Sequence, residues 1–405
     1  MPRRKLVLGG ALIALIAALG VGQSKLQAAI AGRMVDAPRF EVDPLWPKPM
    51  PNQILGMAIG VGVDSRDHVF IVHRDNTIDP RTEGGAQANP PTAECCRAAP
   101  PVLEFDPDGN LVNSWGGPGK GHDWPISNHG ISIDHKDNVW IGGNGTCNDS
   151  IAKAGSCVVG SEDSYVLKFT HDGKLLMQIG APNQRRNSLS QTSFGRVAKI
   201  SFDARANEAY FSDGYGNKRV AVVDMDNGKI KRFWGAYGNV PSDSNYPRYN
   251  PDAPLIPQFR TPVHCAEPTN DGLVYVCDRP NNRIQVFQKD GKFVKEVRIA
   301  PRTLGDGAVW DIAFSRDPQQ KYLYLADGKN ERVYIMDRNS LQILTQFGDG
   351  GRQPGQFIGV HSIATDSKGN IYTTETYAGR RLQKFVYKGI APVTKMNQGV
   401  LWPAK

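Results

Sequence analysis

Three of the eight histidines, His129, His264 and His361, each begin a short apolar segment of similar pattern. Imidazole nitrogen is a common ligand of Zn²⁺, and a site with three protein ligands leaves one coordination position open for water or substrate. The three histidines therefore form a candidate zinc site, provided that the fold brings them together. The alternative is three separate histidines, each held by a hydrogen bond in a core or tunnel.

Three further side chains with catalytic potential follow the next apolar segment of their region: Arg74, Tyr215 and Arg279. Arginine offers a planar fork of donors that binds a carboxylate or an oxyanion through two hydrogen bonds. Tyrosine beside a metal ion can accept or donate a proton. If these turns open on the same side as the histidines, they would line the mouth above the metal. The alternative for each arginine is an ordinary surface ion pair.

The elements that must position these residues are β-strands. Apolar and polar residues alternate along the chain, and Asp-Gly, Asn-Gly or Lys-Gly turns close many of the segments, which is typical of an all-β fold. Six copies of one pattern recur, and their starts are separated by 70, 69, 66, 46 and 51 residues. The copies begin at Ile59, His129, Ala198, His264, Trp310 and His361.

Copies of 40 to 50 residues with four strands each are typical of propeller blades, and the longer copies carry inserts. The third strands share an arginine followed by alternating apolar residues, as at 219–222 and 283–286, and this pattern resembles the NHL repeat. We therefore predict an all-β, six-bladed β-propeller of NHL-type repeats with four antiparallel strands per blade. Alternate blades of such a propeller lie about 120° apart around the axis. The histidines of copies two, four and six should then converge.

The N-terminus carries the features of an export signal. Three basic residues at 3–5 precede an uncharged apolar run over 6–22 and a small-residue stretch over 28–31. We predict a signal peptide over residues 1–31. An uncleaved N-terminal membrane anchor is the alternative, because the apolar run is near the shortest length that spans a bilayer. The protein is therefore expected to be exported, either periplasmic or secreted.

Beyond the signal, we expect an N-terminal extension over 32–52, the propeller over 53–390 and a C-terminal tail over 391–405. Hydrophobic residues make up 40% of the chain, which is enough for a core and excludes a disordered or collagen-like protein. The net charge of +8 arises from basic residues scattered among 40 acidic ones. This pattern indicates a mixed solvated surface, so we expect no nucleic-acid partner.

Six cysteines in an exported chain are expected to form disulfide bonds. Cys147 and Cys157 flank one polar loop, whereas Cys265 and Cys277 stand on neighbouring strands of a predicted hairpin. Each of these two couples can therefore pair locally. The adjacent cysteines at 95–96 can bond to each other or to cysteines elsewhere. The five remaining histidines fall in predicted turns or loops and are expected to be mostly solvated.

The sequence around the candidate residues resembles the lyase domain of peptidylglycine α-amidating enzymes over the whole predicted propeller. The matching strings are Ile-Val-His-Arg74, Asn-His129-Gly-Ile, Phe-Ser-Asp-Gly-Tyr215, Val-His264 with Cys-Asp-Arg279, and Val-His361-Ser-Ile. The resemblance implies a six-bladed propeller that binds zinc through three histidines. It also implies cleavage of a peptidyl-α-hydroxyglycine into a peptide amide and glyoxylate.

The resemblance assigns a role to each matching residue. The three histidines would bind zinc, Tyr215 would take the proton of the substrate's hydroxyl, and Arg74 and Arg279 would hold its carboxylate. Calcium is also implied, with the main-chain carbonyls of Val61 and Ile131 as ligands. Position 362 is a serine where the family has an aspartate, so the expected calcium site lacks its charged ligand.

These observations predict a zinc-dependent carbon–nitrogen lyase that acts on a peptidyl-α-hydroxyglycine or a related carbinolamide. Its expected partner is a small molecule or peptide with a carboxylate, and membrane contact is expected only through an uncleaved anchor. One alternative is a metal-dependent propeller hydrolase such as a lactonase, for which carboxylate and asparagine metal ligands are expected. Another is a non-enzymatic NHL interaction module without a metal ion.

Overall fold

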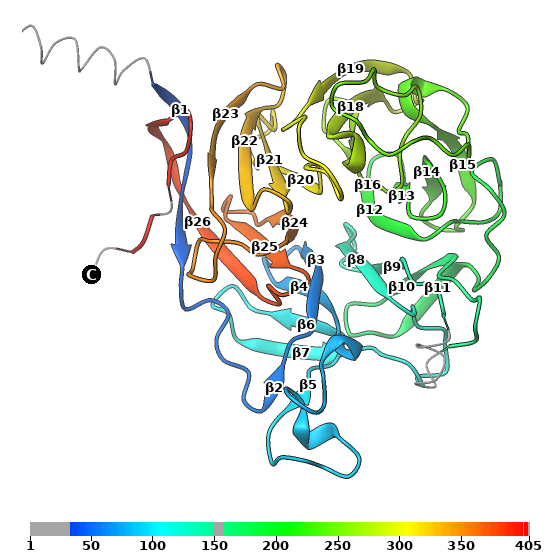
Figure 1. Ribbon diagram of the computed structural model, residues 1–405, viewed down its shortest axis with the longest axis vertical. Helices are drawn as coiled ribbons and strands as arrows, with labels where there is room; N and C mark the ends of the chain where they lie inside the picture. Colours follow the sequence, from blue (N-terminus) through cyan, green and yellow to red (C-terminus); the bar gives the residue numbers. More distant parts are fainter. Residues whose placement is uncertain (1–32, 149–156, 400, 404–405) are drawn as a thin grey trace, which may run out of the picture.

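Six four-stranded antiparallel sheets follow one another around a central axis, and the described residues contain almost no helix (Figure 1). The computed structural model describes residues 33–148, 157–399 and 401–403. The predicted signal peptide, residues 1–31, lies outside the described residues. The structure confirms the predicted all-β, six-bladed propeller with four antiparallel strands per blade.

The first five blades are each built from four strands in chain order. Blade 1 has β3 (Met57–Val63), β4 (Val69–Arg74), β6 (Val102–Phe105) and β7 (Leu111–Trp115). Blade 2 has β8 (Asn128–Ile133), β9 (Val139–Gly143), β10 (Tyr165–Phe169) and β11 (Leu175–Gly180). Blade 3 has β12 (Val197–Asp203), β13 (Glu208–Asp213), β14 (Arg219–Asp224) and β15 (Ile230–Trp234). Blade 4 has β16 (Val263–Pro268), β17 (Leu273–Asp278), β18 (Arg283–Gln288) and β19 (Phe293–Arg298).

Blade 5 has β20 (Asp311–Phe314), β21 (Tyr322–Asp327), β22 (Arg332–Asp337) and β23 (Ile343–Phe347). Blade 6 has β24 (Val360–Thr365), β25 (Ile371–Glu375), β26 (Leu382–Thr394) and, outermost, β1 (Met34–Asp43). The short strands β2 (Gln53–Ile54) and β5 (Arg97–Ala98) form a separate parallel pair. Short 3₁₀ turns lie in the connections, namely η1 (Asp75–Thr77), η2 (Gly85–Gln87), η3 (Ala236–Gly238) and η4 (Arg279–Asn281).

Blade 6 takes its outermost strand from the N-terminal side of the chain. β1 runs antiparallel to β26, starting with Met34 opposite Thr394, and the two strands lie side by side in Figure 1. Phe40 and Val42 of β1 enter the core of this blade. The expected boundaries therefore differ from the structure, because part of the 32–52 segment belongs to the propeller and β26 runs past the expected end. The physical reason is that β1 covers the edge of β26, whose backbone groups would otherwise be unpaired.

The hydrophobic cores lie between neighbouring blades. Alternate side chains of each strand point to opposite faces of its sheet, so both faces can pack. Between blades 2 and 3, Trp140 and Val166 of one blade share a cluster with Ile200 and Phe211 of the other. The innermost strands β3, β8, β12, β16, β20 and β24 surround the axis (Figure 1). Residues at the same level of these six strands consequently meet at the axis.

Buried ion pairs fix the turns that follow the second strands of blades 3 and 4. The guanidinium of Arg219 lies 2.8 Å from the carboxylate of Asp213, and that of Arg283 lies 2.7 Å from that of Asp278. All four side chains are fully buried. A buried charge is tolerated only when it is paired and hydrogen-bonded, so each pair holds one defined turn geometry. The first pair flanks Tyr215, which stands between its two members in the chain.

The structure confirms the two predicted disulfides, Cys147–Cys157 and Cys265–Cys277. The adjacent cysteines at 95–96 are bonded to each other. Disulfides form and persist in oxidising environments, so these bonds indicate such an environment for the folded protein. Among the described residues, no helix is long and apolar enough to cross a membrane.

Candidate metal centre

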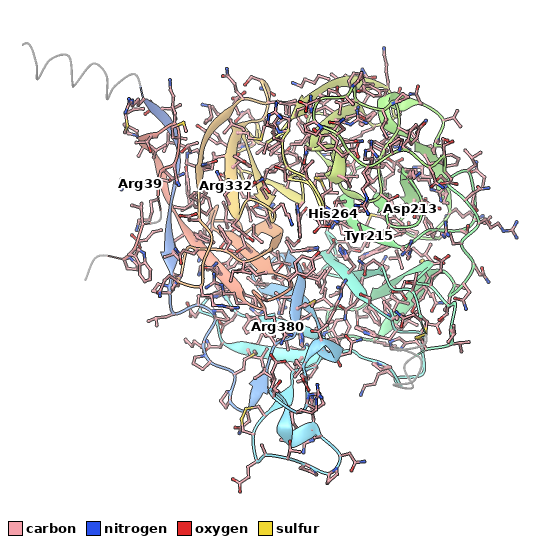
Figure 2. All side chains as sticks on the ribbon, viewed as in Figure 1. Arg39, Asp213, Tyr215, His264, Arg332 and Arg380 are labelled. Atoms are coloured by element: carbon pink, nitrogen blue, oxygen red, sulfur yellow. A yellow bond between two sulfur atoms is a disulfide. The ribbon has the colours of Figure 1, made fainter. Side chains whose placement is uncertain are left out.

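His129, His264 and His361 lie together on the propeller axis. Each is the second residue of an innermost strand, in β8, β16 and β24 respectively. One ligand nitrogen from each lies within 4.8 Å of the other two, and the ring centroids are 4.9 to 5.1 Å apart. All three side chains are buried. Figure 2 shows His264 beside Tyr215 near the centre of the molecule.

Each histidine is oriented by a main-chain carbonyl of the next blade. Nδ1 of His129 donates to the carbonyl oxygen of Ala198 at 2.7 Å, and Nδ1 of His361 donates to that of Ile59 at 2.5 Å. His264 donates in the same way to the carbonyl oxygen of Trp310. The acceptors occupy the equivalent repeat position in the three blades that lack a histidine. With Nδ1 protonated, each neutral ring turns its Nε2 lone pair toward the axis.

Irregular backbone at this level makes the arrangement possible. The pairing register of β8 shifts between His129 and Ile131, and comparable shifts occur at His264 and His361. A β-bulge redirects a side chain that regular pleating would send to a sheet face. Gly130, at the first shift, has φ +66°, and a Cβ atom there would overlap the Ala198 carbonyl oxygen. Glycine at 130 therefore lets β8 approach β12 closely enough for the His129 hydrogen bond.

The surroundings keep the three imidazoles neutral. Burial, reinforced by nearby positive charge, lowers the pKa of His129 and of His264 well below 6.5. Burial, with Arg279 next in importance, lowers the pKa of His361 to about 3. Neutral imidazole is the form that binds metal ions. Three inward Nε2 atoms, each with a fixed Nδ1 partner, thus fit a Zn²⁺-type ion with three nitrogen ligands.

Tyr215 stands directly against the three histidines. Its hydroxyl lies 3.0 Å from Nε2 of His129 and 3.2 Å from Nε2 of His264. Arg196 donates a hydrogen bond of 2.8 Å to the main-chain carbonyl of Tyr215, which holds the turn. The phenol oxygen is therefore within reach of any ligand that shares a metal ion with the histidines.

Arg279 follows β17 and reaches the same place from blade 4. Its Nη1 lies 3.4 Å from the Tyr215 hydroxyl, and its guanidinium lies over the ring of Trp310, 4.8 Å from the centroid. The Nε atom of Arg279 is buried without a hydrogen-bond partner among the described residues. The free donor is available to a ligand.

Arg74 ends β4 and approaches the site from blade 1. Its Nε donates to the main-chain carbonyl of Asn128 at 3.2 Å, and its Nη2 donates to the side chain of Asn144 at 2.8 Å. Burial lowers the pKa of Arg74, against the opposing influence of Tyr215 and Asp163. The two hydrogen bonds fix the plane of the guanidinium and leave Nη1 for another acceptor.

Several residues near the site were not predicted from the sequence. Asn144 and Asp163 belong to an insert, and Asp163 accepts hydrogen bonds from three main-chain N–H groups while burial raises its pKa to about 6. Tyr377 interacts electrostatically with Arg74 and Arg279. A signal for Tyr377 exists, because it follows the end of β25 by two residues, as Tyr215 follows the end of β13.

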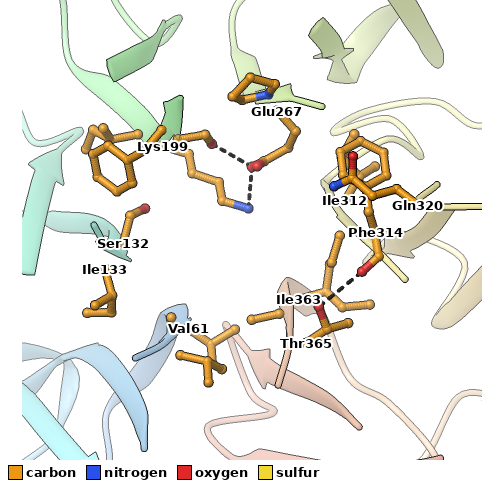
Figure 3. Close-up of a pocket in the computed structure, with 18 of the residues that line it drawn as sticks. Val61, Ser132, Ile133, Lys199, Glu267, Ile312, Phe314, Gln320, Ile363 and Thr365 are labelled. Atoms are coloured by element: carbon orange, nitrogen blue, oxygen red, sulfur yellow. Dashed lines mark hydrogen bonds and ion pairs between the residues drawn. The ribbon is translucent and has the colours of Figure 1, made fainter. Parts of the chain in front are cut away.

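The residues expected to bind calcium do not fit that ion. Val61 and Ile131 line a cavity of about 370 Å³ that also contains Lys199 (Figure 3). The ammonium group of Lys199 lies 2.6 Å from Asp311 and 2.8 Å from Glu267. Ser362 supplies a hydroxyl that donates to Asp311 at 2.6 Å, so it offers no charge to a cation. A positive group already lies beside the carboxylates that a calcium ion would need.

A second cluster of possible metal ligands lies away from the axis. It includes a histidine, and together with the buried His73 it corrects the prediction that the remaining histidines are mostly solvated. Asp64, Glu104 and His171 bring their ligand atoms within 4.8 Å of one another. The guanidinium of Arg66 contacts all three side chains, so a cationic group of the chain already lies against both carboxylates. His73 is fully buried in β4, and burial lowers its pKa to about 4. The axial histidines are therefore the stronger candidate metal centre.

Comparison with known proteins agrees with this fold. The NHL repeat family matches residues 269–287. The chain is 24% identical over 377 residues to NHL repeat-containing protein 3 of Mus musculus, with 88% of this chain and 86% of that protein covered. It is 25% identical over 353 residues to peptidyl-glycine alpha-amidating monooxygenase B of Xenopus laevis, with 84% of this chain and 35% of that protein covered. The chain thus spans about a third of the length of the latter.

Among solved structures, a Bacteroides thetaiotaomicron protein of unknown function matches with a TM-score of 0.50 and 14% identity. The match covers 87% of this chain and 77% of the other, and it concerns the fold alone. The protein is therefore a six-bladed propeller that carries an NHL repeat and has weak sequence similarity to peptidylglycine α-amidating monooxygenases and to NHL repeat-containing proteins.

Proposed function

We propose that the protein is a zinc-dependent lyase that cleaves the C–N bond of a peptidyl-α-hydroxyglycine or a related carbinolamide. The products would be an amide and a glyoxylate-type aldehyde. The observation that carries this proposal is the set of three inward Nε2 atoms with the Tyr215 hydroxyl 3.0 Å from one of them. The similarity to an amidating enzyme of Xenopus laevis supports it.

Zinc held by the three histidines would supply a Lewis acid for the hydroxyl group of the substrate. Tyr215 is the proposed acceptor for the proton of that hydroxyl, and Nη1 of Arg279 lies 3.4 Å from its oxygen atom. The electron pair left on oxygen forms the C=O bond while the C–N bond breaks. The departing amide nitrogen takes up one proton, which Tyr215 can return. No oxidant or reductant is consumed, because the carbinolamide carbon already has the oxidation state of an aldehyde.

Arg74 and Arg279 bind the carboxylate of the hydroxyglycine in this proposal. Each guanidinium keeps a donor that has no hydrogen-bond partner in the part of the chain that the structure describes, namely Nη1 of Arg74 and the buried Nε of Arg279. Two guanidinium groups on the same side of the histidines are suited to a planar anion. The partner of the site is therefore a small molecule or peptide with a free carboxylate. We also propose that the protein is exported, since its cysteines are disulfide-bonded.

A metal-dependent hydrolase of the lactonase type is disfavoured by the donor set. The axial cluster consists of three imidazoles, whereas that hydrolase would be expected to use carboxylate and amide oxygens. An interaction module without enzymatic activity would not need Nδ1 of each axial histidine to be held by a carbonyl of the neighbouring blade. These orienting hydrogen bonds favour a metal enzyme.

The test is glyoxylate release from an N-acyl-α-hydroxyglycine by the purified protein, compared with hydrolysis of a simple lactone. The proposal predicts glyoxylate formation that is lost in His264→Ala. The matched control is His135→Ala, which changes an exposed histidine in the turn after β8. Lactone hydrolysis without glyoxylate formation would replace the lyase by the hydrolase. A zinc-loaded protein that shows neither glyoxylate release nor lactone hydrolysis would contradict the proposed substrate class.

A further inference from the structure

Lys199 places an ammonium group in the cavity that Val61 and Ile131 line. The residue lies in β12, next to Ala198, whose carbonyl oxygen orients His129. Its side chain is 13% exposed, and its Nζ atom contacts both Asp311 at 2.6 Å and Glu267 at 2.8 Å. An ammonium group loses its hydration when it is buried, and two carboxylates at hydrogen-bond distance compensate that loss.

The contacts of Lys199 extend to four of the six innermost strands. Lys199 belongs to β12, Glu267 to β16 and Asp311 to β20. Asp311 in turn accepts hydrogen bonds from the hydroxyl of Ser362 at 2.6 Å and from the N–H of Ile363 at 3.0 Å, both in β24. A single positive charge thus links four blades across the axis.

The two remaining innermost strands approach each other without charged groups. A Cβ atom at Gly60 in β3 would lie 2.6 Å from the main-chain nitrogen of Ile131 in β8. The backbones are therefore in direct contact there, and only glycine fits. Val61 and Ile131 face the same cavity as Lys199, and Figure 3 shows Lys199 and Glu267 meeting in it.

The ammonium group is a permanent charge. Burial alone would lower the pKa of Lys199, but Asp311 and Glu267 outweigh burial and raise it overall. A protonated lysine cannot dissociate from its site, whereas a bound metal ion can. The ammonium group of Lys199 thus provides a cation at the place where the family resemblance implies calcium.

We propose that Lys199 is the structural cation of this propeller and replaces the calcium ion that the resemblance implies. The protein accordingly requires no calcium to hold its blades together. The proposed role of Lys199 concerns this cavity and does not rest on the proposed lyase activity.

The first experiment measures thermal unfolding of the wild-type protein by circular dichroism. The protein is dialysed into calcium-free buffer with added ZnCl₂, so that the histidines stay loaded. It is compared with the same buffer containing about 5 mM CaCl₂, several times the weakest typical protein Kd for this ion, about 1 mM. The proposal predicts the same Tm within about 1 °C, and elemental analysis should find no calcium. A Tm that rises by several degrees with CaCl₂, or one retained calcium per chain, would overturn it.

The second experiment removes the charge with Lys199→Met. The buried Asp311 and the partly buried Glu267 would then lose their cation, and the Tm should fall by about 5–10 °C. The matched control is Lys136→Met, whose lysine side chain is 59% exposed and should shift the Tm by about 1 °C or less. An unchanged Tm for Lys199→Met would refute the proposal. If this variant does not fold, the calcium comparison on the wild type still decides.

Discussion

Replacing Tyr215 by Phe removes one oxygen atom from the centre of the proposed chemistry. That oxygen lies 3.0 Å and 3.2 Å from two histidine nitrogens and 3.4 Å from Arg279, and the ring can stay in place without it. The phenol is the proton acceptor in the proposed mechanism, and a positioned acceptor contributes about 10²- to 10⁴-fold to the rate. The expected loss of kcat is therefore equivalent to about 3–5 kcal/mol of activation free energy.

The assay is glyoxylate release from an N-acyl-α-hydroxyglycine under saturating substrate, with metal content measured on the same preparation. We expect kcat to fall by at least about 100-fold while the zinc content is unchanged, since Tyr215 is not a proposed ligand. Tyr249→Phe is the matched control, because the hydroxyl of Tyr249 bonds to the carbonyl oxygen of Pro301 and to Arg298, both on the outer surface. A Tyr215→Phe enzyme with more than a third of the wild-type kcat would refute the assignment of Tyr215 as the base.

Three further predictions concern charged side chains elsewhere in the propeller and at the site. Arg279→Ala should raise KM for a carboxylate-bearing substrate by about 10- to 100-fold and also lower kcat, because Arg279 contacts both the substrate site and the base; steady-state kinetics with wild-type constants would contradict it. Arg219→Met leaves Asp213 buried without a cation and should cost about 3–5 kcal/mol in urea unfolding, and a cost below about 1 kcal/mol would show that this pair does not hold the turn. Burial opposes ionisation of Glu208, but hydrogen bonds from Arg232 and Lys231, together with the charge of Arg232, outweigh burial and lower the pKa of Glu208 to about 2. The pair therefore stabilises the fold above about pH 4.5 and less as the pH falls toward 2, so Glu208→Gln should be less stable than wild type at pH 7 and similar at pH 2; equal stability at pH 7 would contradict this.

The blade architecture could be predicted because each copy repeats one pattern of strands and turns. The alternation of histidine with Ile59, Ala198 and Trp310 also indicates that three imidazoles face one axis. The repeat specifies a level on the innermost strand, and six strands share that level around the axis. What the repeat cannot specify is the partner of each Nδ1 atom, since that depends on bulges and on the neighbouring blade.

The closure of the propeller could not be predicted in the same way. β1 has no counterpart in the repeat at the N-terminus, because it completes a blade whose other strands lie more than 300 residues later in the chain. Lys199 and Asp311 likewise come from different copies, 112 residues apart, and neither belongs to a local motif. Asn144 and Asp163 lie between β9 and β10, in an insert that is not part of the repeated pattern. Long-range pairs of this kind become visible only in three dimensions.

The proposed chemistry depends most directly on the metal centre, and elemental analysis of the purified protein measures its zinc content. We expect about one zinc per chain in the wild type and in His135→Ala, and less than about a tenth of that in His129→Ala, because two imidazoles alone form a weak site. A wild-type protein that contains no zinc after reloading with ZnCl₂ and desalting, or a zinc content that His129→Ala leaves unchanged, would contradict the assignment of the axial histidines as the metal centre.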